Sequence, residues 1–381
     1  MTTDSSDNDK NILEKLIGGI KEAVDVNSTD KLLEKVSVLQ ESEKLVDEKK
    51  TETSAKSPVG LDVGTSRIVG LRIVDNQLVP NDQLNAFFTI PPSIFAKDML
   101  NKNKIQHVEL ENGQLAVLSY GAQEFGNIFN GEIRRPMSHG LLKAEEPEAI
   151  QIIKEIIKLA VGKPKEIGTS LCFGVPAPKA GFESDLIFHE SMIKRYLVGL
   201  GYKAKSITEG MAIVLSELSR DNFTGIGISM GGGMCNVCFS FLSVPIIVFS
   251  VSKGGDDIDL NVSRVVNETR NRVRVMKEES LDLSRAPRNK IENAFEIYYE
   301  DLILSVLTQL NAVLSQAQNM PKLHQAIPIV LAGGTCMPIG FKMKFEKILK
   351  QVTLPIQISE VRMATDPMRA TAKGALINAG V

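Results

Sequence analysis

The sequence predicts an α/β protein with two related halves, and a repeated pattern is the main observation behind this prediction. In residues 60–73 and again in residues 225–242, an apolar run enters a tight glycine turn and a second apolar run leaves it. Strand-like runs joined by a short glycine turn are typical of β-hairpins. A third glycine loop follows the apolar run at residues 327–332. We therefore expect three glycine loops at the ends of strands.

The composition narrows the class of protein. The chain has 381 residues, of which 43% are hydrophobic and 24% charged, and its formal net charge is −2. This length can bury the cores of two or more domains. The near-neutral charge and the absence of Trp argue against a nucleic-acid partner, because such proteins use basic surfaces and stacked aromatic rings.

The location predicted from the sequence is the cytoplasm. No apolar run is long enough to span a membrane, and the N-terminal residues do not resemble a signal peptide. The four Cys residues lie in apolar surroundings without the spacing of a disulfide framework, which is typical of a reducing compartment.

Residues 1–58 are predicted to be a partly helical tail that ends in a disordered linker, because their mixed charges leave little apolar area to bury. Residues 11–24 and 31–40 carry apolar side chains at helical spacing. The first of these segments could dock on a partner protein or on a membrane. Its acidic and basic residues cancel, whereas an anionic membrane favours a basic face. A partner protein or a transient helix is therefore favoured, with membrane association as the alternative.

The other elements of the first half follow from the period of the apolar residues. After the hairpin, strands are expected within residues 78–94, which end in a turn, and at residues 115–118 and 169–175. Helices are expected at residues 121–129, 148–161 and 191–201, with an isoleucine-rich core face in the second of them.

The second half is interpreted in the same way. A helix at residues 210–218 precedes the second hairpin, and residues 245–251 continue the sheet. Residues 258–318 are expected to be mostly helical, with one break at Ala286-Pro287 because proline disfavours helix in the residue before it. The expected order then ends with a strand at 327–332, a helix at 338–349, a strand at 356–359 and a closing helix at 370–379.

The glycine loops suggest a phosphate site. A glycine loop can present several backbone N–H groups to one anion. Asp62 ends the first strand, where a carboxylate can hold hydrated Mg²⁺ beside bound phosphates. Two simpler roles remain open at this point: Asp62 could cap its own turn, and Glu209 could serve as a favourable charge at a helix N-terminus. Cys235 and Cys238 lie three apart on a strand, so they point to opposite faces and are expected in the core.

The order of these motifs resembles the actin, sugar-kinase and heat-shock-chaperone ATPase superfamily. Within it, residues 59–381 most resemble the bacterial actin-like proteins of the MreB and MamK type. The segment from Arg135 to Gly140, which reads Arg-Pro-Met-Ser-His-Gly, is similar to their Arg-Pro-Met-x-Asp-Gly segment. Gly174-Val175-Pro176, Thr208-Glu209-Gly210, Gly255-Asp256 and Asp366-Pro367 complete the similarity.

The resemblance implies an actin-like fold, in which two related α/β domains flank a nucleotide cleft. Residues 59–206, joined by the C-terminal segment 360–381, would form the first domain, and residues 207–359 the second. It also implies ATP and Mg²⁺ as cofactors and self-association into filaments.

The site residues are also carried over from the resemblance. By this resemblance, Gly64, Thr65 and Ser66 would hold the β- and γ-phosphates, and Asp62 would lie near Mg²⁺. Gly231, Gly232 and Gly233 clamp the phosphates from the other domain, and Gly333, Gly334 and Thr335 lie against the adenosine. Glu209 orients the attacking water.

Three residues depart from the family pattern. Ser229 replaces the Asp expected near the metal, Met234 replaces a Thr, and His139 replaces an Asp. Removing one group that stabilises the transition state commonly costs about 100-fold or more in rate. We therefore expect nucleotide binding with slow or absent hydrolysis. The alternatives are a monomeric chaperone-like or regulatory ATPase and a nucleotide-binding scaffold without catalysis.

Overall fold

The computed structural model describes residues 57–129, 131–143, 146, 148–178, 183–318 and 320–380. The predicted tail, including residues 11–24 and 31–40, lies outside the described residues except for Ser57 and Pro58. None of the helices within the described ranges is both long and apolar enough to cross a membrane.

The first half is built on a five-stranded sheet with the order β10-β9-β1-β2-β3. β1, β2 and β3 form an antiparallel meander, and β1, β9 and β10 run parallel. The strands are β1 (Val59–Val63), β2 (Arg67–Val74), β3 (Gln77–Leu84), β9 (Thr169–Val175) and β10 (Tyr202–Thr208).

The second half repeats this topology in the sheet β13-β12-β11-β14-β15. Again three strands form a meander, and two more run parallel to its first strand. The strands are β11 (Gly225–Met230), β12 (Cys235–Phe241), β13 (Val244–Val251), β14 (Ile327–Ala332) and β15 (Ile358–Met363). The prediction of two related halves is therefore confirmed.

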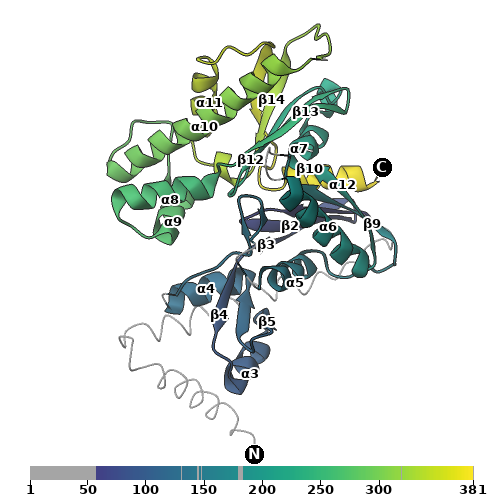
Figure 1. Ribbon diagram of the computed structural model, residues 1–381, viewed down its shortest axis with the longest axis vertical. Coiled ribbons are helices and arrows are strands. Elements are labelled where there is room, and N and C mark those ends of the chain that lie inside the picture. The colour runs from purple at the N-terminus through teal and green to yellow at the C-terminus, as the bar shows by residue number, and fades with distance from the viewer. Residues whose placement is uncertain are drawn as a thin grey trace, which may run out of the picture. The chain divides into compact units, whose positions relative to one another are not determined.

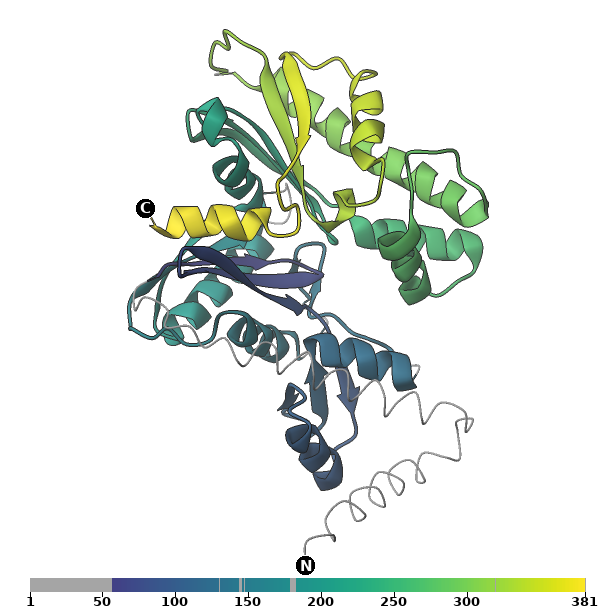
Figure 2. The ribbon, with the colours of Figure 1, turned by 180° about the vertical axis from the view of Figure 1, so that it is seen from behind.

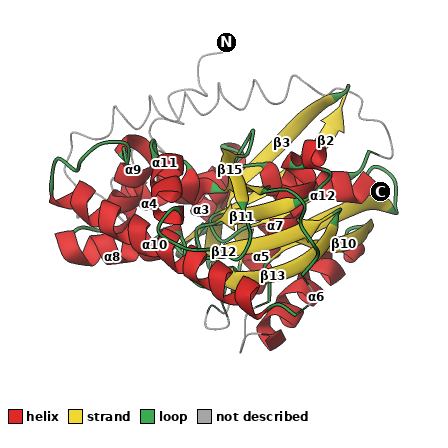
Figure 3. Cartoon of the chain, turned by 90° about the horizontal axis from the view of Figure 1, so that it is seen from above, coloured by secondary structure: helices red, strands yellow, loops and turns green. Residues whose placement is uncertain are grey.

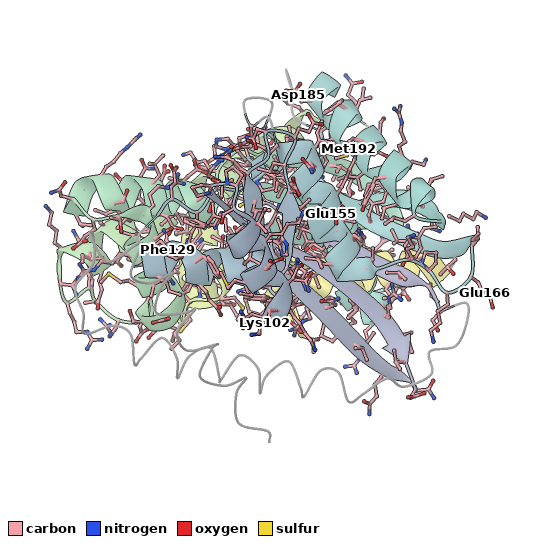
Figure 4. The ribbon with its side chains drawn as sticks, turned by 90° about the horizontal axis from the view of Figure 1, so that it is seen from below. Lys102, Phe129, Glu155, Glu166, Asp185 and Met192 are labelled. Carbon is pink, nitrogen blue, oxygen red and sulfur yellow. The ribbon has the colours of Figure 1, made fainter. Side chains whose placement is uncertain are left out.

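Helices cover both faces of each sheet, as parallel strands require. Figure 1 shows α5 (Ala149–Val161) and α6 (Glu183–Gly199) on one face of the first sheet, and Figure 4 views this face and labels Glu155 on α5 and Met192 on α6. The second sheet is covered on its outer face by α8 (Gly255–Val266), α10 (Lys290–Gln316) and α11 (Phe341–Leu349), with α9 (Arg270–Ser280) beside α8.

Two further helices, α7 (Glu209–Glu217) and α12 (Ala370–Gly380), form a middle layer. α7 packs on β11 and β12, and α12 packs on β1 and β9. Figure 2 shows the C-terminal α12 between the two sheets. Each half keeps a core of its own, with Ile152, Ile153, Ile156 and Ile157 of α5 in the first.

Smaller elements extend the first half. β4 (Phe87–Ile90), β5 (His107–Glu109) and β6 (Leu115–Leu118) form a three-stranded sheet. α3 (Ile94–Lys102) and α4 (Ser119–Phe129) accompany it, and β7 (Met137–Ser138) pairs with β8 (Leu141–Leu142). Short 3₁₀ helices occupy Ser219–Asp221 and Gly334–Cys336.

The sequence interpretation missed several features, among them β5 and the β7–β8 hairpin. The expected turn at the end of residues 78–94 is followed by α3, which was not expected, and Ser93 caps this helix by accepting a hydrogen bond from Ala96 N. β10 was not expected between α6 and α7. Residues 258–318 contain a second break, because Asn267 adopts a left-handed conformation (φ 57°) that ends α8, and Thr269 caps α9.

The meanders end in outer strands that each contain a proline. β3 and β13 lie at corresponding edges of the two sheets, and Figure 3 shows the β2–β3 hairpin from above. Pro80 of β3 pairs with Leu71 of β2, and Pro245 of β13 pairs with Ser240 of β12. Proline is tolerated at an edge because its missing N–H group need not face the neighbouring strand.

The middle layer depends on backbones in direct contact. A Cβ atom at Gly374 of α12 would overlap the carbonyl of Ala212 in α7, and one at Gly60 of β1 would overlap the carbonyl of Ala372. Neither obstacle is the end of a flexible side chain, so a larger residue could fit only if a helix moved.

We expect Gly374→Ala to lower the free energy of unfolding by about 2 kcal/mol, since overpacking of this kind costs roughly 1–3 kcal/mol. Chemical denaturation measures the loss. Gly199→Ala is the matched control, because a Cβ at the end of α6 meets open space, and we expect a change within about 1 kcal/mol. Equal effects of the two changes would contradict the close contact of α7 and α12.

Candidate functional site

The two hairpin tips have the same backbone turn. The first tip is residues 64–67 between β1 and β2, and the second tip is residues 231–234 between β11 and β12. Gly64 N donates to Arg67 O at 2.9 Å, and Gly231 N donates to Met234 O at 3.0 Å. The turn places Asp62 near the end of β1 and Ser229 at the equivalent position near the end of β11. The repeat therefore extends from the topology of the sheets to the geometry of the loops.

The carbonyl groups of both tips are hydrogen-bonded from behind. Asn85 donates through Nδ2 to Gly64 O at 2.9 Å. At the second tip, the N-terminus of α8 donates from Gly255 N to Gly231 O at 3.1 Å and from Asp256 N to Gly232 O at 2.8 Å. These bonds hold each loop and occupy the carbonyl oxygens of Gly64, Gly231 and Gly232.

The amide groups of the tips are free by contrast. The N–H groups of Thr65, Ser66, Gly232 and Gly233 have no acceptor among the residues that the structure describes. Successive unpaired N–H groups in a tight loop form a concave site that attracts anions. This arrangement fits phosphate oxygens without any basic side chain.

The tips face each other at close range. Gly232 lies against the Ser66 side chain, and Gly233 lies against Thr65, so a Cβ at either glycine would overlap a hydroxyl group. Thr65 Oγ1 accepts from Gly140 N at 3.0 Å, which adds the β7–β8 turn to the cluster. The hydroxyl groups belong to the first tip, and they fit against the second tip because Gly232 and Gly233 have no side chain.

The β7–β8 turn explains one departure from the family pattern. His139 (φ 49°) and Gly140 (φ 76°) both adopt left-handed conformations, as a two-residue hairpin turn requires. His tolerates this conformation, as Asp and Asn do. The replacement of Asp by His139 therefore preserves the turn. The Met234 side chain packs against Gly140 from the second tip.

Two carboxylates lie side by side below the tips. Asp62 is the residue before the last of β1, and Glu209 begins α7. Gly174 of β9 lies next to both, because a Cβ there would be 3.6 Å from Asp62 Oδ1 and 3.7 Å from Glu209 Cγ. Glu209 Oε2 accepts from Ser229 Oγ at 2.8 Å and from Asn236 Nδ2 at 2.9 Å. The second hairpin thus fixes the orientation of Glu209.

The surroundings raise the pKa of both carboxyl groups. Burial raises the pKa of Glu209, while the hydrogen bonds from Ser229 and Asn236 oppose the rise. Burial, and next the charge of Glu209, raise the pKa of Asp62 well above its usual range. The pair therefore tends to keep a proton, and a cation between or beside the two groups would favour their ionised forms.

The donor set fits Mg²⁺ better than a transition metal. The described residues contain no group of three His, Cys, Asp or Glu side chains that could hold a metal. Mg²⁺ is commonly held by one or two carboxylates together with water and phosphate oxygens. Asp62 has no hydrogen-bond donor within the described ranges, so its oxygens are available to such an ion.

The third glycine loop is joined to the second tip. Gly333 (φ 99°) lies against the carbonyl of Met230, where a Cβ would overlap, and its N–H donates to Pro367 O at 2.7 Å. Thr335 Oγ1 donates to Gly231 O at 2.7 Å. The third loop and the second tip are therefore in direct contact.

A cavity of about 520 Å³ brings the site together. It extends from the hairpin tips past the third loop to α9 and α10. All the site residues expected from the sequence line it: Asp62, Gly64, Thr65, Ser66, Glu209, Gly231, Gly232, Gly233, Gly333, Gly334 and Thr335. The roles assigned to them remain predictions, but the chain does bring them to one place.

The far wall of the cavity was not predicted. Lys277 of α9 donates to Gly255 O at 2.9 Å and forms a buried ion pair with Asp259 at 2.7 Å. The Tyr299 hydroxyl of α10 is buried without a partner among the described residues. These residues lie in ordinary helical stretches, so no local pattern in the sequence marks them. Cys235 and Cys238, as expected, are buried in separate core clusters.

Comparison with known proteins identifies the family. The chain matches the Volactin family over residues 58–379. The chain belongs to the Volactin family. A comparison with curated protein sequences gave no match.

Solved structures confirm the fold. A MamK double helical filament is 16% identical, with a TM-score of 0.63, and the match covers 85% of this chain and 99% of that one. MreB 5 of Spiroplasma citri bound to AMPPNP is 13% identical, with a TM-score of 0.59 and coverage of 85% and 96%. A non-polymerising MamK mutant bound to AMPPNP is 18% identical, with a TM-score of 0.53 and coverage of 86% and 100%. This Volactin family member therefore has the fold of bacterial actin-like proteins, as predicted.

The acid pair yields a prediction on stability. A carboxyl group whose pKa is raised by folding costs stability when it is charged, and this cost disappears as the pH falls through the folded-state pKa. We expect Asp62→Asn to raise the melting temperature of the metal-free protein at pH 8, and we expect the gain to shrink towards pH 5.

Thermal unfolding across this pH range measures the effect. Asp75→Asn is the matched control for loss of one negative charge, because Asp75 is exposed at the β2–β3 turn. A gain for Asp62→Asn that grows as the pH falls would show that the sign of the pKa shift is wrong.

Proposed function

We propose that this chain is a nucleotide-binding, actin-like cytoskeletal protein that takes ATP with Mg²⁺, forms filaments and hydrolyses ATP slowly. One observation carries the proposal: two opposed hairpin tips with free N–H groups lie above a carboxylate pair and open into one cavity. The tips offer donors for phosphate oxygens, and the carboxylates offer ligands for a hard cation.

The solved relatives support the ligand and the assembly without testing them in this chain. A MamK structure and a MreB structure with this fold were determined with AMPPNP bound, and another MamK structure is a filament. Fold alone does not define function, so the proposal depends on the site residues described above.

The chain's own residues can supply part of the chemistry of hydrolysis. Bound Mg²⁺ would neutralise the charge of the phosphates. Glu209 can orient a water or accept its proton, provided that an oxygen lone pair is free. Ser229 and Asn236 both donate to Oε2 of Glu209, so they stabilise the ionised form and lower its basicity. This arrangement, together with the loss of an Asp at position 229, supports slow turnover.

A second candidate is a nucleotide-binding scaffold without catalysis. The observation that favours it is the same pair of hydrogen bonds, which direct Glu209 towards protein donors. Under this alternative the nucleotide would bind and organise the two halves without being hydrolysed.

Light scattering and negative-stain electron microscopy with ATP and Mg²⁺, alongside phosphate release, test the proposal. We expect filaments together with phosphate release much slower than that of ordinary actin-like proteins. Binding without assembly would support a scaffold or a monomeric switch. Turnover at the usual rate of actin-like proteins would contradict the proposed slow hydrolysis.

Position 229 allows a gain-of-function test. Ser229→Asp introduces a carboxylate next to Glu209, and we expect phosphate release to rise about tenfold or more, since single groups of this kind are worth that much in rate. In metal-free buffer the same change should lower the melting temperature, because a third carboxylate joins Asp62 and Glu209. Ser229→Asn has a similar size without the charge, and an equal gain from it would falsify the electrostatic explanation.

A further inference from the structure

Arg135 joins the two hairpin tips. Its Nη1 atom donates to Ser66 Oγ at 3.0 Å, and to Asp256 Oδ1 and Oδ2 at 2.7 and 2.9 Å. Ser66 belongs to the first tip, and Asp256 lies in the first turn of α8, whose N–H binds Gly232 of the second tip. One guanidinium group therefore contacts both halves of the molecule where the tips meet.

The rest of this guanidinium group is available. All three of its hydrogen bonds involve Nη1, and the other N–H groups of Arg135 have no partner in the described part of the chain. Arg135 lines a second cavity of about 590 Å³, which reaches the tips at Gly233. A planar fork with free donors is suited to bidentate binding of phosphate oxygens.

The charges around Asp256 also favour an anion. The positive charge of Arg135, followed by those of Lys277 and Arg270, lowers the pKa of the Asp256 carboxyl group despite its burial. Asp256 is thus an ionised carboxylate within a group of cations. A phosphate with two negative charges would compete with it for the same donors.

Geometry requires a change of partner when phosphates bind. The tips now touch, with Gly232 against Ser66, so a phosphate can lie between them only if the tips separate. Ser66 would then move away from Asp256, and Arg135 could not keep both partners. A phosphate between the tips would offer oxygens at the position that Arg135 already occupies.

The position of Arg135 indicates which phosphate it would bind. The third glycine loop and the α9 wall line the first cavity, and Arg135 lines the second cavity on the other side of the tips. A nucleotide whose nucleoside lies against the third loop would direct its last phosphate towards Arg135.

We propose that Arg135 distinguishes triphosphate from diphosphate by leaving Asp256 and binding the terminal phosphate of the nucleotide. This inference rests on the proposed nucleotide site. It assigns a specificity role to a residue that neither the loops nor the acid pair accounts for. Without nucleotide, Asp256 holds the guanidinium group in place. When nucleotide binds, the Asp256 carboxylate competes with the phosphate for this guanidinium group.

Calorimetric titration of AMPPNP and ADP, each with Mg²⁺, tests the inference on the full chain. We expect Arg135→Gln to weaken AMPPNP binding about tenfold or more, because hydrogen bonds between charged groups are worth that much, and to weaken ADP binding less than about threefold. Arg270→Gln is the matched control: it removes a neighbouring cation whose side chain is bonded to the Asp256 carbonyl at 3.4 Å and not to the tips.

A second variant separates phosphate recognition from a simple link between the halves. Asp256→Asn removes the competitor, so AMPPNP affinity relative to ADP should stay equal or rise. A structural link would make Arg135→Gln and Asp256→Asn change this ratio in the same direction, and that result would overturn the inference. Equal weakening of both nucleotides by Arg135→Gln would overturn it as well.

Two further outcomes are a wild-type chain that binds no nucleotide and an Arg135→Gln variant that does not fold. If the wild-type chain binds neither nucleotide, the proposed function fails, and the inference fails with it. If Arg135→Gln does not fold, Arg135→Lys gives the answer, because it keeps the charge but loses the fork. We then expect a selective loss for AMPPNP that is smaller than that for a neutral residue, and an unchanged ratio would count against the inference.

Discussion

The contact between α7 and α12 is the constraint on which the rest of the structure depends. Their backbones touch at Gly374 and Ala212, so the two sheets share one thin middle layer. Glu209 is the first residue of α7, and Pro367, just before α12, accepts the hydrogen bond of the third glycine loop. The helices that join the halves therefore also position the acid pair and the loop beside the cavity.

The two hairpins contribute different chemical groups to the site. The first hairpin supplies hydroxyl groups and Asp62, whereas the second supplies bare backbone and neutral donors. Ser229 and Asn236 bind Glu209 without adding charge, which limits the repulsion within a buried pair of acids. Under the proposed function, the same neutrality removes a group that could assist bond cleavage. A neutral residue at position 229 thus favours the stability of the metal-free protein, whereas a carboxylate there would favour hydrolysis.

Much of the fold and of the candidate site can be predicted from the sequence, because the glycine loops directly follow apolar strands. The order of strand and loop is visible locally, whereas Glu209 is singled out by the resemblance of Thr208-Glu209-Gly210 to the actin-like family. Lys277, Asp259 and Tyr299 could not be found in this way, because their shared position depends on how α8, α9 and α10 pack. Arg135 and Asp256 are 121 residues apart, so their ion pair has no local signal. β10 was missed because its sequence contains Lys203, Lys205, Ser206 and Thr208 and so has no apolar run, and α3 because its start depends on the Ser93 cap.

The prolines in the outer strands have a consequence for how copies of the chain can meet. An exposed strand normally offers a continuous ladder of donors and acceptors to any other strand. Pro80 in β3 and Pro245 in β13 interrupt that ladder at the matching edges of both sheets. A neighbouring molecule that aligned a strand there would find a missing donor and a rigid ring. Association along these borders must therefore rely on complementary side-chain surfaces, which can be reversible and specific, and not on the growth of a shared sheet.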